Sequence, residues 1–251
     1  MMFPPTHGVA AASLLQETVA LLDAMDVPPP AGRLRLYDNT IRDLIRAGLW
    51  SKLAFWYALG AHDDQASLLD WRHPADADMT LVATNSPTFT TDRGWAGDGS
   101  TKYLQTTETM NNMAPYALNS AHAGFWSLDN TQANNGDVSS AAGTPLRVTA
   151  RTLTDTQLTR LNAASNDNIA LVDSRGHFLA NRSGASAVEV YLNGASIGSN
   201  TRASTAVPTD ALRGAINTRR LMLLHGGSSL TAGEAATLYA IAGRWKTGIG
   251  A

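Results

Sequence analysis

A glycine-rich turn between residues 94 and 104 is the feature of this sequence that most constrains its fold. Three glycines and an aspartate fall within six residues. Glycine takes up positive φ angles freely, and aspartate hydrogen-bonds to nearby backbone in turns. Residues 88–90, which are β-branched and aromatic, precede the turn, and the alternating residues 102–105 follow it. This succession of strand, turn and strand predicts a chain that is mainly β.

Strand patterns recur along the rest of the chain. Residues 52–59 are apolar on both faces, which predicts a buried central strand. Residues 186–192 alternate and then meet Asn193-Gly194, the strongest short-range signal for a β-hairpin. Connections rich in asparagine and glycine separate the other predicted strands, a spacing that favours an antiparallel sandwich. Those strands are residues 80–84, 122–128, 146–151, 168–172, 177–181 and 220–224.

Helices are predicted at both ends of the chain. Residues 11–26 place apolar side chains at helical spacing, and a second short helix is predicted from Asp38 to Gly48. Near the C-terminus, Thr231 and Glu234 form a capping-box pattern that predicts a closing helix packed on the sandwich. The apolar stripe of the first helix consists of Leu14, Leu15, Val19 and Leu22.

The proline-rich residues 27–32 predict an extended spacer, and thus a helical arm over residues 1–49 followed by a sandwich over residues 50–251. The stripe on the arm has two interpretations. It attaches the chain to a partner or to sister subunits, or it packs on the sandwich. Amphipathic periodicity reports that a face is buried without naming the surface that covers it, so both remain open.

Composition excludes several classes of function. The net charge of −2 gives no basic footprint for binding nucleic acid, and no apolar run is long enough to span a bilayer. The chain has no cysteine, so neither a disulfide nor a thiolate metal site is expected. The first residues lack the pattern of a signal peptide, which leads us to expect synthesis in a cytoplasm.

Three segments, met in the same order, resemble signatures of the laminin-G-like, concanavalin A-like jelly rolls, above all the versions encoded by tailed bacteriophages. They are Gly-Asp-Gly-Ser-x-x-Tyr-Leu at residues 97–104, Val-Glu-Val-Tyr-Leu-Asn-Gly at residues 188–194, and residues 229–239. The resemblance covers roughly residues 50–251. It implies an antiparallel jelly-roll β-sandwich, to which the sequence adds the helical N-terminal arm and the C-terminal helix.

The resemblance implies three functions of different kinds. The first is a non-enzymatic structural or accessory component of a phage particle: a capsid decoration, head fibre or tail-associated protein. Such a protein is made in the host bacterial cytoplasm, is displayed on the virion surface, contacts other virion proteins and forms a homo-oligomer. The second is a glycan-binding module for host adhesion, and the third is a polysaccharide hydrolase. Fold analogy alone does not choose between them.

A hydrolase of the retaining glucanase type needs two carboxylates about 5 Å apart. Its relatives present them as Glu-x-Asp-x-x-Glu, a pattern that is absent here. No Gly-x-Ser-x-Gly nucleophile turn occurs, and the six histidines are scattered in sequence. We therefore expect no enzymatic activity, no cofactor and no metal.

Carbohydrate binding is favoured by aromatic rings that lie near polar side chains, because sugars stack on exposed rings and a few polar groups orient them. Each ring has an equally simple interpretation as part of the core. Binding is expected in the loops around Trp95 and at residues 106–119. The expected ligand-binding set is Trp95, Asp98, Asn111, Asn112, Tyr116 and Trp126.

Overall fold

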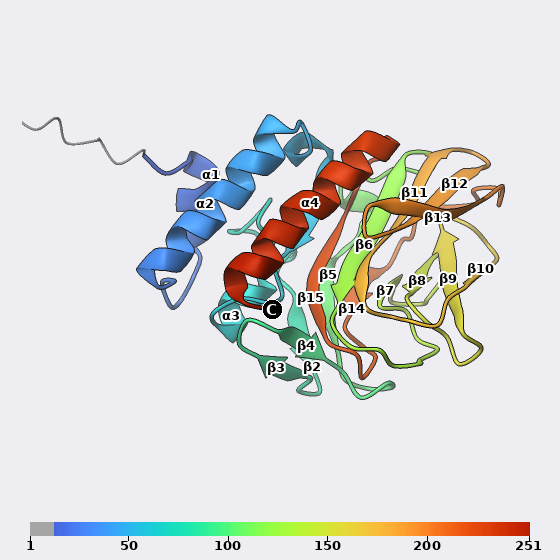
Figure 1. The fold of residues 1–251 in the computed structure, drawn as a ribbon, viewed down its shortest axis with the longest axis horizontal. Coiled ribbons are helices and arrows are strands. Elements are labelled where there is room, and N and C mark those ends of the chain that lie inside the picture. Colours follow the sequence, from blue (N-terminus) through green and yellow to red (C-terminus); the bar gives the residue numbers. More distant parts are fainter. Residues whose placement is uncertain (1–12) are drawn as a thin grey trace, which may run out of the picture.

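The computed structural model describes residues 13–251. In it, strands that are mostly apolar on both faces pair into the first of two antiparallel sheets (Figure 1). In β1 (Leu53–Tyr57), β6 (Ala121–Ser127) and β15 (Leu221–Gly227) every residue is buried. Strands covered on both faces have this composition. The strand order is β13-β12-β11-β6-β15-β4-β3, and β1 pairs with β15 rather than lying between two strands. The other strands are β3 (Thr88–Thr90), β4 (Gly94–Ala96), β11 (Gly176–Gly184), β12 (Ala187–Leu192) and β13 (Ala195–Asn200).

The second sheet packs on the first and completes the predicted sandwich. Its strand order is β10-β9-β8-β7-β14-β5-β2. Apolar side chains on its inner face, such as Leu104 and Leu212, meet Phe55, Phe125 and Phe178 of the first sheet. The expectation of a mainly β antiparallel sandwich is confirmed. The strands are β2 (Val82–Thr84), β5 (Tyr103–Thr109), β7 (Val138–Ser140), β8 (Leu146–Thr149), β9 (Thr156–Leu161), β10 (Asp167–Ala170) and β14 (Ala211–Gly214).

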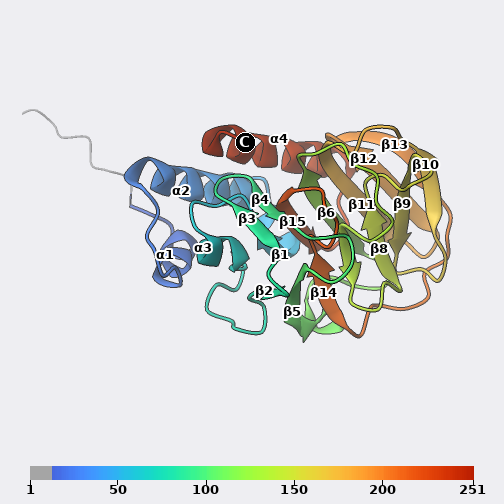
Figure 2. The same ribbon diagram turned by 90° about the horizontal axis from the view of Figure 1, so that it is seen from below.

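A layer of helices covers the face of the first sheet that points away from the second, which we call its outer face (Figure 2). Aromatic rings fill the space beneath the helices. The ring centroids of Tyr37, Trp71 and Trp245 lie 4.9–5.1 Å apart, and Trp56 of β1 packs against Trp71. The predicted closing helix is present, with its capping box. Within residues 13–251 the helices are α1 (Gln16–Asp23), α2 (Ala31–Arg46), α3 (Asp64–Leu68) and α4 (Ala232–Ile249), and the 3-10 turns are Trp50–Lys52 and Met110–Asn112.

The N-terminal helices pack on the rest of the chain, which is one of the two interpretations left open by the sequence. On α1, Leu21 is fully buried, and Leu15 and Leu22 pack against the same core. Leu14 is half-buried, whereas Val19 is 42% exposed. The stripe therefore packs mainly on its own chain, while Val19 remains on the surface, and attachment to a partner stays a prediction. The part of the predicted helix before residue 13 lies outside the described residues.

The second helix begins seven residues earlier than expected. It starts at Ala31, directly after Pro30, because proline is tolerated at the start of a helix. Asp38, predicted to cap this helix, lies inside it and caps α1 instead. Its carboxylate accepts hydrogen bonds from the Leu15 N–H (2.9 Å) and the Thr18 hydroxyl (2.8 Å). Burial would raise the pKa of Asp38, but these hydrogen bonds and the Arg42 guanidinium outweigh it and lower the pKa.

Three histidines that are far apart in sequence meet on the outer face of the first sheet. His122, His177 and His225 are buried on β6, β11 and β15, and the Nε2 atoms of His177 and His225 are 2.8 Å apart. Gly124 leaves room for this cluster, since a Cβ there would lie 2.5 Å from the His225 ring. Burial lowers the pKa of His122 to about 4 and that of His177 to about 3, and it also lowers the pKa of His225.

Replacement of the Asp38 carboxylate is expected to destabilise the fold. Asp38→Ala removes the cap of α1 and leaves the Leu15 N–H without its acceptor, which costs about 1–2 kcal/mol. Urea unfolding measures this loss. Asp43→Ala is the matched control on the same helix, because surface ion pairs such as its pair with Arg244 contribute about 0.2–1 kcal/mol and, within the described residues, Asp43 caps no helix. Equal effects of the two substitutions would contradict the capping role.

Acidification is expected to destabilise the fold through the three buried histidines. Their pKa values in the folded chain lie below the ordinary value of 6.5, so the unfolded chain takes up protons first as the pH falls. The stability they contribute is complete above about pH 6.5 and is lost towards lower pH, at about 1.4 kcal/mol per pH unit for each histidine. Urea unfolding from about pH 8 to about pH 5 tests this. His177→Gln should reduce the slope of the unfolding free energy against pH by the contribution of one histidine, about 1.4 kcal/mol per pH unit. A free energy of unfolding that is constant over this range would refute the prediction.

Candidate functional site

The structure places the three predicted sugar-stacking rings in the core. Trp95 is 5% exposed, Tyr116 5% and Trp126 7%. The Trp95 Nε1 donates a hydrogen bond to the Ser67 hydroxyl (2.7 Å), and the Tyr116 hydroxyl donates to the Asn162 side chain (2.7 Å). Trp126 packs beneath α4. The prediction that these rings form an exposed platform is wrong, because large rings supply most of the packing area of a sandwich.

The three polar residues of the predicted set remain on the surface and serve local structure. The Asp98 carboxylate accepts hydrogen bonds from three successive backbone N–H groups of its own turn. The backbone N–H of Lys102 is the main reason that the pKa of Asp98 lies far below its usual range. Asn111 and Asn112 lie on the 3-10 turn after β5, where Asn112 donates to the Glu108 carboxylate (2.9 Å). The predicted residues therefore do not converge on one site.

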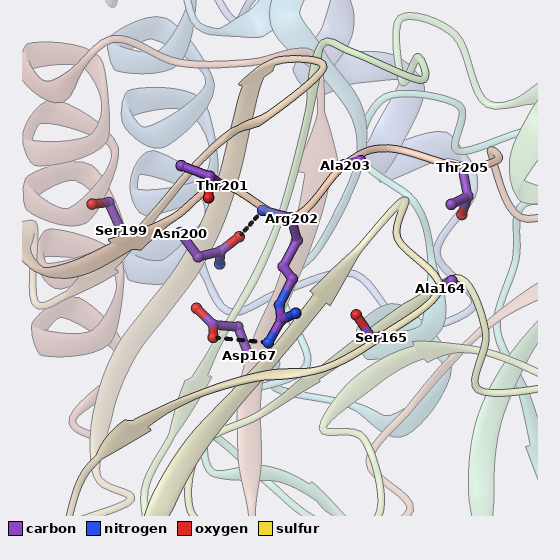
Figure 3. Close-up of a pocket in the computed structure, with 9 residues that line it drawn as sticks. All are labelled: Ala164, Ser165, Asp167, Ser199, Asn200, Thr201, Arg202, Ala203 and Thr205. Atoms are coloured by element: carbon purple, nitrogen blue, oxygen red, sulfur yellow. Dashed lines mark hydrogen bonds and ion pairs between the residues drawn. The ribbon is translucent and has the colours of Figure 1, made fainter.

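An open pocket with polar walls lies where edge strand β10 of the second sheet meets edge strand β13 of the first (Figure 3). Its volume is about 560 Å³. The turn between β9 and β10 forms one wall, and the end of β13 with the segment after it forms the other. We call this the polar pocket. Its lining residues are Ala164, Ser165, Asp167, Ser199, Asn200, Thr201, Arg202, Ala203 and Thr205.

The polar pocket offers hydrogen-bond donors and acceptors of several kinds. Figure 3 shows the Arg202 guanidinium extending towards the Asp167 carboxylate, and their nearest atoms are 3.9 Å apart. The Asn200 side-chain oxygen accepts a hydrogen bond from the Arg202 backbone N–H (3.1 Å). Hydroxyls of Ser165 and Thr205 line the same space. Carboxylate, amide, guanidinium and hydroxyl groups together can both donate to and accept from a polyhydroxylated ligand.

A buried arginine of β11 holds the walls of the polar pocket in place. Arg182 is fully buried, and its guanidinium donates to the Leu161 carbonyl of β9 (2.8 Å) and to the Arg202 carbonyl (3.0 Å). Asn162 fixes two neighbouring segments, because its carbonyl accepts from the Thr205 N–H (2.7 Å) and its side chain donates to the loop at residues 117–118. Both walls of the pocket are therefore held to the sandwich by hydrogen bonds from buried side chains.

Sequence reasoning missed Asp167, Asn200 and Arg202. Each of them lies at the end of an edge strand or just beyond it, in segments whose polar composition resembles any other connection. The predicted binding loop at residues 106–119 is a strand in its first part, because β5 continues to Thr109. Its far end lies next to the pocket, where Asn119 accepts a hydrogen bond from the Ser204 hydroxyl (2.6 Å). Asp167, Asn200 and Arg202 come together because β10 pairs with β9 and β13 pairs with β12. Local sequence patterns do not encode these pairings.

Within residues 13–251, no group of three or more histidine, cysteine, aspartate or glutamate side chains is placed to hold a metal ion. Over the same residues, no helix is both long and apolar enough to cross a membrane.

The sequence matches no protein-family model, and no curated protein matches it. Solved structures with a similar fold exist at low identity. Domain 4 of an extracellular arabinanase from Geobacillus stearothermophilus, in complex with arabinotriose, is 12% identical with a TM-score of 0.55, over 75% of this chain and 98% of that domain. A mutant Trypanosoma rangeli sialidase with trans-sialidase activity is 10% identical with a TM-score of 0.54, over 86% of this chain and 40% of the sialidase.

The binding domain of botulinum neurotoxin serotype D is 8% identical with a TM-score of 0.56, over 76% of this chain and 52% of that domain. The chain thus spans about half or less of the sialidase and toxin structures, but nearly all of the arabinanase domain. Likeness at this level of identity concerns the fold. The chain shares the β-sandwich architecture of these domains.

Proposed function

We propose that the chain is a non-enzymatic glycan-binding β-sandwich module whose polar pocket receives a saccharide. The observation behind this proposal is the pocket itself, in which Asp167, Asn200 and Arg202 stand on a hydrogen-bonded framework around an open space of about 560 Å³. Saccharide hydroxyls need such a mixture of donors and acceptors, and a framework held in place lowers the entropy cost of binding. The arabinanase domain in complex with arabinotriose, which has the same architecture, supports this choice.

The binding is expected to be weak. No aromatic residue is among those lining the polar pocket, so stacking contributes little, and polar groups must exchange water for sugar hydroxyls at little net gain. A dissociation constant on the order of 1 mM for a single saccharide unit follows from these terms. Several copies acting together would be needed for firm attachment to a surface.

The absence of catalysis is part of the proposal. Asp167 is the one carboxylate among the lining residues, whereas the common glycosidase mechanisms use two carboxylates on opposite sides of the scissile bond. Incubation of the protein with a panel of polysaccharides is therefore expected to release no reducing ends. Release above that of a boiled sample would overturn this part.

Location at a virion surface, with contacts to other virion proteins, completes the proposal. It rests on the resemblance of residues 97–104, 188–194 and 229–239 to phage jelly rolls. A protein displayed in this way commonly assembles, so we expect a homo-oligomer. Light scattering coupled to size-exclusion chromatography measures the mass. A mass of 26.6 kDa at every concentration would refute self-assembly.

Substitutions in the polar pocket are expected to weaken saccharide binding without unfolding the protein. Asp167→Ala and Asn200→Ala each remove an acceptor from the pocket and should raise the dissociation constant about tenfold, or about 1.4 kcal/mol. A glycan-array screen would find the ligand, and an NMR titration would measure its affinity.

Asp173→Ala is the matched control for Asp167→Ala. Asp173 is also a half-buried aspartate paired with an arginine, Arg175, at 2.7 Å, but it is not among the residues that line the pocket. It should leave the affinity unchanged. Equal affinities of the wild type, Asp167→Ala and Asn200→Ala would exclude the polar pocket as the binding site.

A further inference from the structure

Three arginines lie in one row across the face of the second sheet that points away from the first. Their strands alternate, so that Leu212, Val138, Val148 and Leu161 point into the core while the intervening residues point outward. In the ladder, Arg213 of β14 is opposite Ser139 of β7, Ser139 is opposite Arg147 of β8, and Arg147 is opposite Arg160 of β9. Residues opposite each other in this way are about 5 Å apart at the Cα atoms.

This row is electrostatically unfavourable for the free protein. Like charges directly opposite in a ladder destabilise it, and burial together with the Arg160 charge lowers the pKa of Arg147. Over the described residues 13–251, none of the three arginines takes part in an ion pair. A net charge of −2 shows that the row does not merely reflect a basic chain. Local arrangements that destabilise the fold, such as this row of like charges, are expected at functional sites.

Arg147 and Arg213 hold unused hydrogen-bonding capacity. Within the described residues, the Arg147 Nε is buried and lacks a hydrogen-bond partner. The Arg213 guanidinium lies over the Tyr103 ring at 3.9 Å, and its Nε and Nη2 both donate to the Gln105 side-chain oxygen (3.1 and 2.8 Å). Arg213 is thus held in one orientation by neutral groups that leave its charge uncompensated.

The surface between these two arginines is hollowed. The hollow has a volume of about 210 Å³, with Ser139 between Arg147 and Arg213 in the ladder and the hairpin loop at residues 141–143 along one side. Two carboxylates lie near the hollow, and within the described residues neither forms an ion pair with Arg147 or Arg213. Asp137 is buried in an ion pair with Arg219 (2.6 Å), and Asp210 accepts a hydrogen bond from the backbone N–H of residue 142. We call this the arginine hollow.

We propose that the arginine hollow binds the carboxylate of an acidic saccharide, with Arg147 and Arg213 as its donors. This inference rests on the glycan-binding function proposed above and adds the chemical class of the ligand. A guanidinium matches a carboxylate in geometry, and charge-assisted hydrogen bonds of this kind are about twice as strong as neutral ones. A bound carboxylate would also relieve the repulsion along the row.

Arg160 connects the arginine hollow with the polar pocket. Its Nη1 donates to the Gly143 carbonyl beside the hollow (2.9 Å), and its Nε donates to the Asn166 side chain (2.8 Å) in the turn that also bears Asp167. An acidic oligosaccharide can therefore extend from the arginine hollow over Arg160 to the polar pocket. The hollow would select the charge, and the pocket would bind the neighbouring hydroxyls.

NMR titration of the full-length protein, observed at the arginine Nε–H resonances, tests the inference. The probes are tetragalacturonate, a hyaluronan tetrasaccharide and sialyllactose, each beside a neutral counterpart: the methyl ester for the first two and lactose for the third. At least one acidic probe should shift the Arg147 and Arg213 resonances and bind about tenfold or more tightly than its neutral counterpart. Absence of any shift with all three acidic probes would overturn the inference.

Substitutions identify the side chains responsible. Arg147→Gln and Arg213→Gln should each weaken binding of the acidic probe about tenfold, whereas Arg244→Gln, an exposed arginine on α4 and the matched control, should have no effect. The unfolding temperature of Arg147→Gln should be unchanged or higher, because a like-charge contact is removed. If Arg147→Gln does not fold, Arg147→Lys keeps the charge and should still lose affinity, since lysine lacks the planar fork.

Three further outcomes decide between a free anion, the proposed function and this inference. If inorganic phosphate or acetate, at the same concentration, shifts both arginines as strongly as the saccharide does, the hollow recognises a free anion and the saccharide inference is overturned. If neutral saccharides bind with dependence on Asp167 while the arginines respond to no acidic probe, the proposed function stands and the inference falls. If acidic saccharides bind with dependence on Arg147 but not on Asp167, the hollow stands and the polar pocket falls.

Discussion

The rest of the structure depends on the need to cover both faces of the first sheet. Phe55, Phe125 and Leu224 point towards the second sheet, while Trp56, Trp126 and Leu223 point the opposite way. Each such side chain contributes about 1.5–3 kcal/mol when it is buried, and it would be left in water if the outer face were bare. The helices α1, α2 and α4 supply that cover from both ends of the chain, so the N-terminal segment is a structural layer of the fold (Figure 1).

Covering one sheet in this way decides where a ligand can approach. The outer face of the first sheet is closed by helices, and its histidines are enclosed there at 0–1% exposure. The outer face of the second sheet and the edge formed by β10 and β13 remain open, and both hollows described above lie there. Arg182 and Arg219 show the contrast within one residue type, since they are fully buried and brace loops, whereas Arg147 and Arg213 line a hollow.

Local patterns predicted the features that depend on neighbouring residues. Asn193 and Gly194 have positive φ angles of 52° and 77° and join β12 to β13, and Thr231 caps α4, as their sequences indicate. Features that depend on register could not be predicted in this way. The histidine cluster and the arginine row are each assembled from separate strands. Asp38 is a residue type that commonly caps helices, but the sequence around it does not reveal which helix it caps. The rings of Trp95 and Trp126 satisfied a binding pattern and a core pattern equally, and packing decided between the two.

The ring cluster beneath the helices has a spectroscopic consequence. Trp71 and Trp245 are far apart in sequence, and they meet at Tyr37 of α2 with centroid separations near 5 Å. The intrinsic fluorescence of these two indoles therefore reports the docking of α2 and α4 on the first sheet. Trp95 lies between the two sheets and reports the closure of the sandwich. One chain thus contains native optical reporters at both of its interlayer interfaces, and each can be read separately once the other tryptophans are replaced.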